Sequence, residues 1–172
     1  MRIGVISDTH GDTLAWDRAL VAFAGCSLVV HCGDILYHGP FNPMLPTYAP
    51  HQLAGALNEA PFPIVFGKGN CDSEVDQLAI SYPIEQPMAH VHLHDLSLLA
   101  LHGDKYDEEG LEKLGRKYGV DIIVRGHTHE CTIRKMGGGL VIMNPGSASL
   151  PKEDPPTVAR IDTEARAIEK TF

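Results

Sequence analysis

Residues 2–11 read RIGVISDTHG and residues 27–34 read SLVVHCGD, and these two stretches decide the fold. Each begins with a short run of aliphatic residues and then changes abruptly to glycine and aspartate. A continuously apolar run of this length is typical of a strand that is covered on both faces. Between them, Asp12 is a candidate N-cap, and Trp16 and Leu20 lie at helical spacing. Alternating strands and helices predict an α/β fold with a partly parallel sheet.

The same alternation continues through the first half of the chain and weakens in the second half. Further apolar runs occupy residues 63–66, 90–94, 96–101, 121–124, 140–143 and 158–161, and further helical patterns surround residues 50–57 and 111–118. The later runs follow one another with little helix between them, which indicates a second sheet. Because no repeat, low-complexity segment or linker divides the chain, we predict a single domain over residues 1–172.

The composition is that of an ordinary globular protein with one unusual feature. The chain has 172 residues, of which 44% are hydrophobic, and a formal net charge of −8. An acidic chain is poorly suited to stable nucleic-acid binding, which depends on an excess of Lys and Arg. A phosphate-containing substrate remains compatible with this charge, because bound divalent metals can invert the local field. The unusual feature is the presence of ten histidines.

Cysteine usage and the apolar runs predict a cytoplasmic protein that does not enter a membrane. The four cysteines, at positions 26, 32, 71 and 131, include no C-x-x-C pair. The chain starts on a strand-like run and shows no secretory signal pattern. Its apolar runs, such as residues 96–101, are far too short to cross a bilayer.

Potential metal ligands follow five of the apolar runs. They are Asp8 and His10, then Asp34, then Asn70, then His102, and finally His127 and His129. In open α/β sheets, binding sites form at the carboxyl ends of the strands, so we expect these seven side chains to meet in one crevice. Each short motif alone is weak, but five in order, each after a strand, favour a site over scattered turn residues.

The types of ligand indicate two metal ions. Carboxylate, imidazole and amide groups together suit Mn, Fe, Co, Ni or Zn better than Ca²⁺ or Mg²⁺ alone. Seven ligands are too many for one open catalytic site, and the two oxygens of Asp34 could bridge a pair of ions. Two metals could clamp a phosphate ester and activate a bridging hydroxide for attack on phosphorus. The sequence therefore predicts a dinuclear metal-dependent phosphoric ester hydrolase.

The five motifs D-x-H, G-D, G-N-x-D, H-G and G-H-x-H resemble those of the calcineurin-like metallophosphoesterase superfamily, and the similarity extends along essentially the whole chain. The stretches GNCDSEVDQ, LYHGP and NPGSAS are more narrowly similar to the YfcE-type phosphodiesterases. This resemblance implies a four-layer α/β/β/α sandwich of two mixed sheets. It also implies manganese as the activating metal, with Ni, Zn, Fe, Co or Mg as alternatives, and a small phosphodiester as substrate.

The resemblance also implies a role for each ligand. Asp8, His10, Asp34 and His129 would hold the first metal, and Asp34, Asn70, His102 and His127 would hold the second. Catalytic roles are predicted for Asp34, Asn70 and His10.

Two positions depart from the superfamily pattern, and a third lies close to the site in sequence. Cys71 stands where many relatives have His after the motif Asn, and a neutral thiol is a poorer acid than imidazolium. Asp104 stands where relatives often have His, and it adds negative charge near the second metal. His38 could touch the phosphate or the leaving group, or could equally bond local backbone. We treat Cys71, His38 and Asp104 as candidate substrate contacts.

Other interpretations remain open at this stage. The alternating His90, His92 and His94 could bind a metal, but a solvated strand face or a subunit contact is favoured. A homo-oligomer, dimer or tetramer, is expected from that strand and from the resemblance. A phosphomonoesterase on the same metals, or a non-catalytic protein-binding scaffold of this fold, are the alternative functions.

Overall fold

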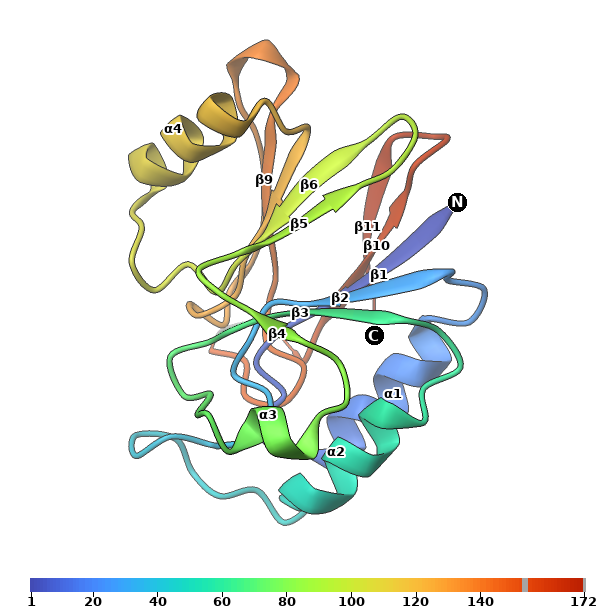
Figure 1. Cartoon of the computed structure of the whole chain (residues 1–172), viewed down its shortest axis with the longest axis vertical. Coiled ribbons are helices and arrows are strands. Elements are labelled where there is room, and N and C mark those ends of the chain that lie inside the picture. The colour runs from blue at the N-terminus through green and yellow to red at the C-terminus, as the bar shows by residue number, and fades with distance from the viewer. Residues whose placement is uncertain (153–154, 172) are drawn as a thin grey trace.

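The computed structural model describes residues 1–152 and 155–171 and contains two mixed β-sheets packed face to face (Figure 1). The first sheet has the order β11 (Ala167–Thr171), β10 (Val158–Asp162), β1 (Arg2–Ile6), β2 (Leu28–His31), β3 (Ile64–Gly67) and β4 (Ile84–Glu85). The second sheet has the order β5 (Ala89–His92), β6 (Ser97–Ala100), β7 (Ile122–Val124), β9 (Val141–Pro145) and β8 (Cys131–Lys135).

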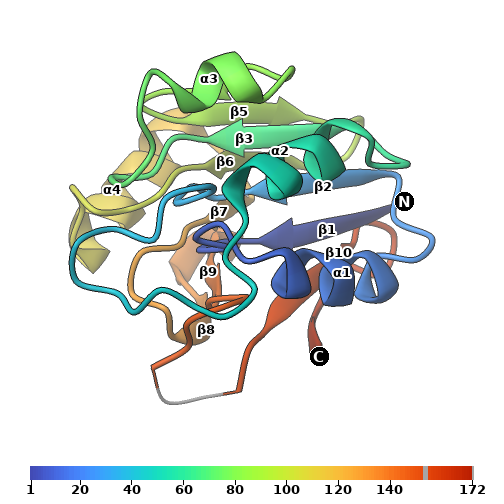
Figure 2. The ribbon, with the colours of Figure 1, turned by 90° about the horizontal axis from the view of Figure 1, so that it is seen from below.

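Helices cover the outer face of each sheet. On the first sheet lie α1 (Thr13–Ala22), α2 (Pro50–Asn58) and α3 (Asp76–Ala79), which Figure 2 shows from the helical side. On the second sheet lies α4 (Glu108–Tyr118), and a short 3₁₀ turn at Gly137–Gly139 joins β8 to β9. The predicted four-layer α/β/β/α sandwich is therefore confirmed.

Three apolar layers explain why the strand segments are continuously hydrophobic. Successive residues of one strand enter different layers, because side chains alternate between the two faces of a sheet. In β1, Ile3 and Val5 pack between the sheets, whereas Ile6 packs beneath α1 and α2. In β6, Leu98 packs between the sheets and Leu99 packs beneath α4. Both faces of these strands are buried, so no polar position interrupts them.

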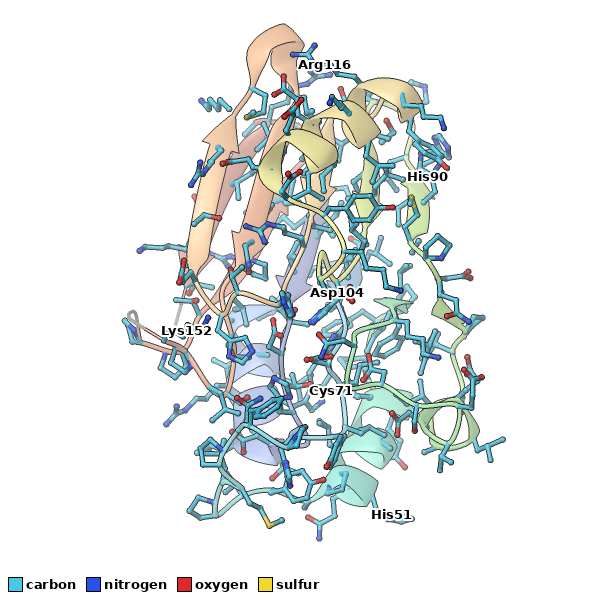
Figure 3. All side chains as sticks on the ribbon, turned by 90° about the vertical axis from the view of Figure 1, so that its left-hand side faces the viewer. His51, Cys71, His90, Asp104, Arg116 and Lys152 are labelled. Carbon is cyan, nitrogen blue, oxygen red and sulfur yellow. The ribbon has the colours of Figure 1, made fainter. Side chains whose placement is uncertain are left out.

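The strand directions bring the loops that carry the predicted ligands to one edge of the sandwich. β1, β2 and β3 are neighbours and run parallel in the first sheet. β6 and β7 are also neighbours and run parallel in the second sheet. Because the carboxyl ends of parallel strands meet at the same edge, the loops after these five strands lie together. They reach the side of the molecule that Figure 3 turns toward the viewer.

Helix caps follow the sequence, whereas several edge elements do not. The Asp12 side chain accepts a hydrogen bond from Leu14 N at the start of α1, as predicted, and Gly119 ends α4 in a left-handed conformation. The predicted strand over residues 90–94 is too long, because β5 ends at His92 and His94 lies in the following turn beside Asp95. Only His90 and His92 share a strand face, with ring centroids 3.9 Å apart.

β4, β8, β11 and α3 were not expected from the sequence. They are short or lie at sheet edges and carry polar, partly exposed residues, so their apolar pattern is weak. Among the helices of the described residues, none combines the length and the apolar character needed to span a bilayer.

Two helical glycines give a matched test of the packing. A Cβ at Gly55 in α2 would meet no atom within 4 Å, whereas one at Gly115 in α4 would lie 2.8 Å from Leu140 Cδ2 and 3.1 Å from Ile123 Cδ1. Gly55→Ala should raise the free energy of unfolding by about 0.8 kcal/mol, because Ala favours the helix. Gly115→Ala should lower it, because overpacking of order 1–3 kcal/mol exceeds that gain. Urea unfolding measures both, and equal stabilisation by the two changes would refute the close packing of α4.

Candidate metal centre

The seven predicted ligands come together at the shared edge of the two sheets. The interior of the site is formed by Asp8, His10, Asp34, His102 and His129, all of which are buried, and its outer part by the exposed Asn70 and His127. The ligating atoms of Asp8, His10 and His129 all lie within 4.8 Å of one another, and so do those of Asp8, Asp34 and His102. The structure thus places in one cluster residues that are up to 121 positions apart, from Asp8 to His129.

The backbone is strained at this cluster and almost nowhere else in the described part of the chain. Six non-glycine residues have positive φ, and five of them are predicted ligands: Asp8 (55°), His10 (46°), Asp34 (55°), His127 (72°) and His129 (60°). Left-handed conformations are unfavourable for residues with a Cβ and persist only where the surroundings impose them. The tight turns after the strands therefore aim these side chains at the centre.

Three imidazoles are fixed by backbone carbonyl groups. Nδ1 lies 2.9 Å from Tyr37 O in His10, 2.9 Å from Cys32 O in His102 and 2.6 Å from Leu150 O in His129. A carbonyl oxygen only accepts, so Nδ1 must carry a hydrogen in each ring. In the neutral ring the lone pair is then on Nε2, which points into the cluster. This is the arrangement in which a protein histidine is held for metal binding.

The inward-facing atoms lack the partners that a buried polar group requires. His129 Nε2 is 3.2 Å from both His10 Nε2 and Asp8 Oδ1, and His102 Nε2 is 3.4 Å from Asp34 Oδ2. Among the described residues, neither Asp8 Oδ1 nor His102 Nε2 has a hydrogen bond of good geometry. Buried polar atoms of this kind are rarely left unsatisfied. Nitrogen and oxygen lone pairs that face one another can be satisfied by a bound cation. The carboxylates and imidazoles of this cluster therefore fit divalent metal ions.

Asn70 and His127 extend the cluster toward solvent. Asn70 Oδ1 lies 3.0 Å from His127 Nδ1, and the ring of His127 stands edge-on to that of His102 with centroids 5.1 Å apart. Cys71 follows Asn70, and its Sγ lies within 4.8 Å of ligating atoms of His10 and Asp34. The thiol therefore lies among the predicted metal ligands, whereas the sequence predicted only a substrate contact for Cys71.

Mutual electrostatics shift the pKa values of the clustered groups. Burial raises the pKa of both carboxyl groups, but the nearby imidazoles outweigh it and hold the pKa of Asp8 and Asp34 below the ordinary range. Burial lowers the pKa of His102, yet the carboxylates raise it to about 9. The pKa of His129 is raised in the same way, whereas burial lowers that of His10. Without a metal, a proton on His102 offsets part of the charge of the two carboxylates.

Asp72 is a functional residue that the motif analysis did not assign. Its carboxylate accepts hydrogen bonds from the backbone nitrogens of Asp34 at 2.9 Å, Ile35 at 2.7 Å and Gly69 at 2.7 Å. Burial nevertheless raises its pKa to about 6. These bonds tie the loop that carries Asp34 to the loop that carries Asn70. The only signal in the sequence was the Asp at the end of the G-N-x-D motif.

The NPGSAS segment, residues 144–149, begins in the last two residues of β9 and forms the back of the site. The hydroxyls of Ser147 and Ser149 both donate to Asp8 O, at 2.9 and 2.8 Å. The side-chain nitrogen of Asn144 donates to Gly126 O at 2.8 Å and so supports the turn that leads to His127. This segment holds two ligand loops in place.

Two cavities flank the cluster, on the face shown in Figure 3. The first, of about 800 Å³, is lined by Asp34, Asn70, Cys71, His127 and His129 together with Tyr37, Gly39, Pro40, Phe41, Asn42, Pro43, Leu150, Pro151 and Lys152. The second, of about 550 Å³, is lined by Asn70, Asp72 and His102 together with Lys68, Gly69, Gln86, Pro87, Leu101, Gly103, Asp104, Lys105 and Tyr106. Asn70 belongs to both cavities.

The candidate substrate contacts are distributed unequally between these cavities. Cys71 lines the first and Asp104 the second, whereas His38 lines neither. The His38 imidazole lies between the rings of Tyr37 and Tyr48 and is hydrogen-bonded to the backbone carbonyl of Gly39. These contacts are the local backbone role that the sequence left open. Phe41 and Lys152, which no sequence motif indicated, also line the first cavity.

Comparison with known proteins gives one consistent family. A model of the calcineurin-like phosphoesterase superfamily domain matches residues 1–166. The phosphodiesterase YfcE of Escherichia coli K12 is 36% identical over 98% of this chain and 91% of its own. A probable metallophosphoesterase of Methanothermobacter thermautotrophicus is 32% identical, over 95% of this chain and 88% of its own. The solved structure of E. coli YfcE, a phosphoesterase, superimposes with a TM-score of 0.85 at 34% identity, covering 99% and 98%.

The raised pKa values predict that metal binding releases protons. Because the nearby carboxylates raise the pKa of His102 to about 9, its imidazole is charged in the metal-free protein near pH 7.5. A metal ligand must be deprotonated, so binding should release at least one proton per chain. Metal affinity should accordingly rise with pH up to about 9 and then level off. Calorimetric titration with Mn²⁺ in buffers of different ionisation enthalpy measures the release, and binding heats that do not depend on the buffer would contradict it.

Proposed function

Because the chain belongs to the calcineurin-like phosphoesterase superfamily, we propose that it is a metal-dependent phosphodiesterase that uses this metal centre. The observation that carries the proposal is the orientation of His10, His102 and His129. Each ring donates through Nδ1 to a backbone carbonyl and directs Nε2 toward buried carboxylates. Among the described residues, Asp8 Oδ1 and His102 Nε2 have no hydrogen-bond partner, and buried, converging oxygen and nitrogen atoms of this kind are suited to cations rather than to a protein core.

The two ions would divide the ligands as the motifs predict. Asp8, His10 and His129 would hold one ion, Asn70, His102 and His127 would hold the other, and Asp34 would contact both. Bound divalent ions supply Lewis acidity at phosphorus and lower the pKa of a water molecule toward neutrality.

The residues of the chain bind and orient the ester. Asn70 lines both flanking cavities, so a phosphoryl group at the metal centre could extend one substituent into each. A phosphodiester has two such substituents, whereas a monoester has one, and this supports the diester. The Lys152 ammonium at the wall of the first cavity can attract the anionic substrate.

Cys71 and Asp104 are the proposed substrate contacts, one in each cavity. The ring contacts of His38 with Tyr37 and Tyr48 support a structural role in the loop instead. Burial and the nearby carboxylates raise the pKa of the Cys71 thiol to about 12, so the thiol is neutral in the metal-free protein. A neutral thiol neither protonates a leaving group as imidazolium does nor acts as a nucleophile.

Manganese as the native metal, a dimer or tetramer, a cytoplasmic location and one domain over residues 1–172 stay predictions from the sequence. Gel filtration with light scattering would settle the oligomeric state. Metal analysis of protein purified without added metal would identify the native ion.

The first prediction for function concerns metal-dependent hydrolysis. Metal-stripped protein should regain cleavage of bis(p-nitrophenyl) phosphate when Mn²⁺ is added and should cleave p-nitrophenyl phosphate more slowly. Asp34→Asn should lower turnover at least 100-fold, because Asp34 lies among the ligating atoms of both ions. Asp76→Asn is the matched control, since the Asp76 carboxylate lies outside the metal-ligand clusters and accepts a local hydrogen bond from Ser73 N.

Other results of this hydrolysis assay would distinguish the alternative functions. Faster cleavage of the monoester would favour a phosphatase. Stoichiometric metal binding without cleavage of either ester would favour the scaffold. Full activity of Asp34→Asn would refute the ligand assignment.

The second prediction concerns Cys71. Cys71→His should raise turnover of methyl phenyl phosphate relative to methyl p-nitrophenyl phosphate, because an imidazolium can protonate the poorer leaving group. Cys71→Ser, which stays neutral, should leave that ratio close to the wild-type value. A ratio that does not change in the His variant would show that Cys71 does not face the leaving group.

A further inference from the structure

His31 is a buried titratable residue that the proposed chemistry does not use. It is the last residue of β2, has no exposed surface and pairs in register with Ile6 on one side and Phe66 on the other. Its ring stacks on the Phe66 ring with centroids 5.6 Å apart and an interplanar angle of 27°. The other residues of β2 are Leu28, Val29 and Val30, so an aliphatic residue would suit this position equally well. A buried imidazole is costly unless both of its nitrogens have partners.

Both nitrogens do have partners, and their chemistry determines the tautomer. Gly33 N is 3.2 Å from His31 Nδ1, and a backbone N–H can only donate, so Nδ1 carries the lone pair. The neutral ring then carries its hydrogen on Nε2, which is 3.0 Å from Thr9 Oγ1. The Thr9 hydroxyl in turn donates to Ile35 O at 2.8 Å. Gly33, His31, Thr9 and Ile35 thus form a hydrogen-bond chain with a single direction.

These four residues join the two turns that carry the buried ligands Asp8, His10 and Asp34. Thr9 lies between Asp8 and His10, whereas Gly33 and Ile35 flank Asp34. Backbone bonds connect the same turns, from Asp8 N to Gly33 O at 3.1 Å and from His10 N to Asp34 O at 3.0 Å. All three ligands have positive φ, a conformation that the surroundings must impose. The side chains of His31 and Thr9 supply the bonds between the turns that the backbone cannot make.

We propose that His31 and Thr9 are positioning residues, which hold Asp8, His10 and Asp34 in ligand geometry before a metal binds. The proposal rests on these three residues being metal ligands, as proposed above. Its physical basis is preorganisation: a ligand set that must first adopt strained turns binds a metal more weakly by the cost of adopting them. Partners outside the ligand set commonly change metal affinity by about 10- to 100-fold when they are lost.

Variants can separate positioning from simple core packing. His31→Leu keeps an apolar contact with Phe66 and removes both hydrogen bonds of the imidazole. Thr9→Val keeps the branched shape and removes only the hydroxyl. Val29→Ala is the matched control, because Val29 is an equally buried β2 residue and its truncation lowers stability without touching the hydrogen-bond chain. His31→Gln retains a donor for Thr9 and should restore part of the loss.

The test is Mn²⁺ affinity, measured by calorimetry on metal-stripped protein. His31→Leu and Thr9→Val should each raise the Kd about tenfold, and the double variant should bind no more weakly than the weaker single variant, because both changes break one chain. Val29→Ala should leave the Kd within twofold of wild type. A Kd within twofold of wild type in both His31→Leu and Thr9→Val would overturn the proposal. Absence of Mn²⁺ binding to the wild-type protein would instead overturn the proposed function.

A spectroscopic measurement tests the hydrogen bonds from Gly33 through His31 and Thr9 to Ile35 in the wild-type protein, so it needs no variant that could fail to fold. ¹⁵N chemical shifts of the histidine rings distinguish the two neutral tautomers. In the metal-free wild-type protein, His31 should show the neutral form with its hydrogen on Nε2. A hydrogen on Nδ1, or a charged ring at pH 7, would overturn the proposal.

Discussion

The structure depends on the burial of two carboxylates, Asp8 and Asp34, whose oxygens lie within 4.8 Å of His102 Nε2 in the interior of the molecule. Two negative charges so close together in a low-dielectric environment repel each other strongly and lose their hydration. Cationic partners must therefore compensate them in every state of the protein. Without metals, a proton on His102 offsets part of this charge, and the carboxylates raise the pKa values of both His102 and His129.

The need to place cationic partners beside these buried carboxylates explains the strain in the surrounding backbone. The seven predicted ligands must point at one another from five loops, and five of them are residues with positive φ. Such turns persist because the loops are bonded to one another through Asp72, through Ser147 and Ser149, and through the backbone. The parallel strands set the positions of the loops, and these bonds set their conformations. Rigid strands thus allow a strained site to be stable.

Much of the fold and the ligand set could be predicted from the sequence, because both depend on patterns that are local in the chain. Apolar runs mark the buried strands, and the polar residues that directly follow these runs include Asp8, Asp34 and His102. Edge strands such as β8 escape this reasoning, since their polar, half-exposed residues carry little periodic signal.

The supporting residues could not be predicted for a different reason. The Asp72 carboxylate accepts hydrogen bonds from three backbone N–H groups. The side chains of His31 and Thr9 are hydrogen-bonded to each other and to backbone groups of the turn that carries Asp34. The direction of a backbone N–H depends on loop geometry, which one sequence does not reveal. The length of β5 was overestimated because His94 continues the alternation of His90 and His92 although the chain already turns at Asp95. The local sequence pattern identifies the predicted metal ligands, but not the residues that hold the ligand loops in position.

Charge links metal binding to substrate binding in this acidic protein, whose net charge is −8. The two central carboxylates, with their imidazoles neutral, carry two negative charges and would repel a phosphate ester. Two divalent ions add four positive charges, so the loaded centre becomes positive while the rest of the protein stays negative. An anionic substrate would then be attracted to the one region where the field is inverted, beside Lys152 in the first cavity.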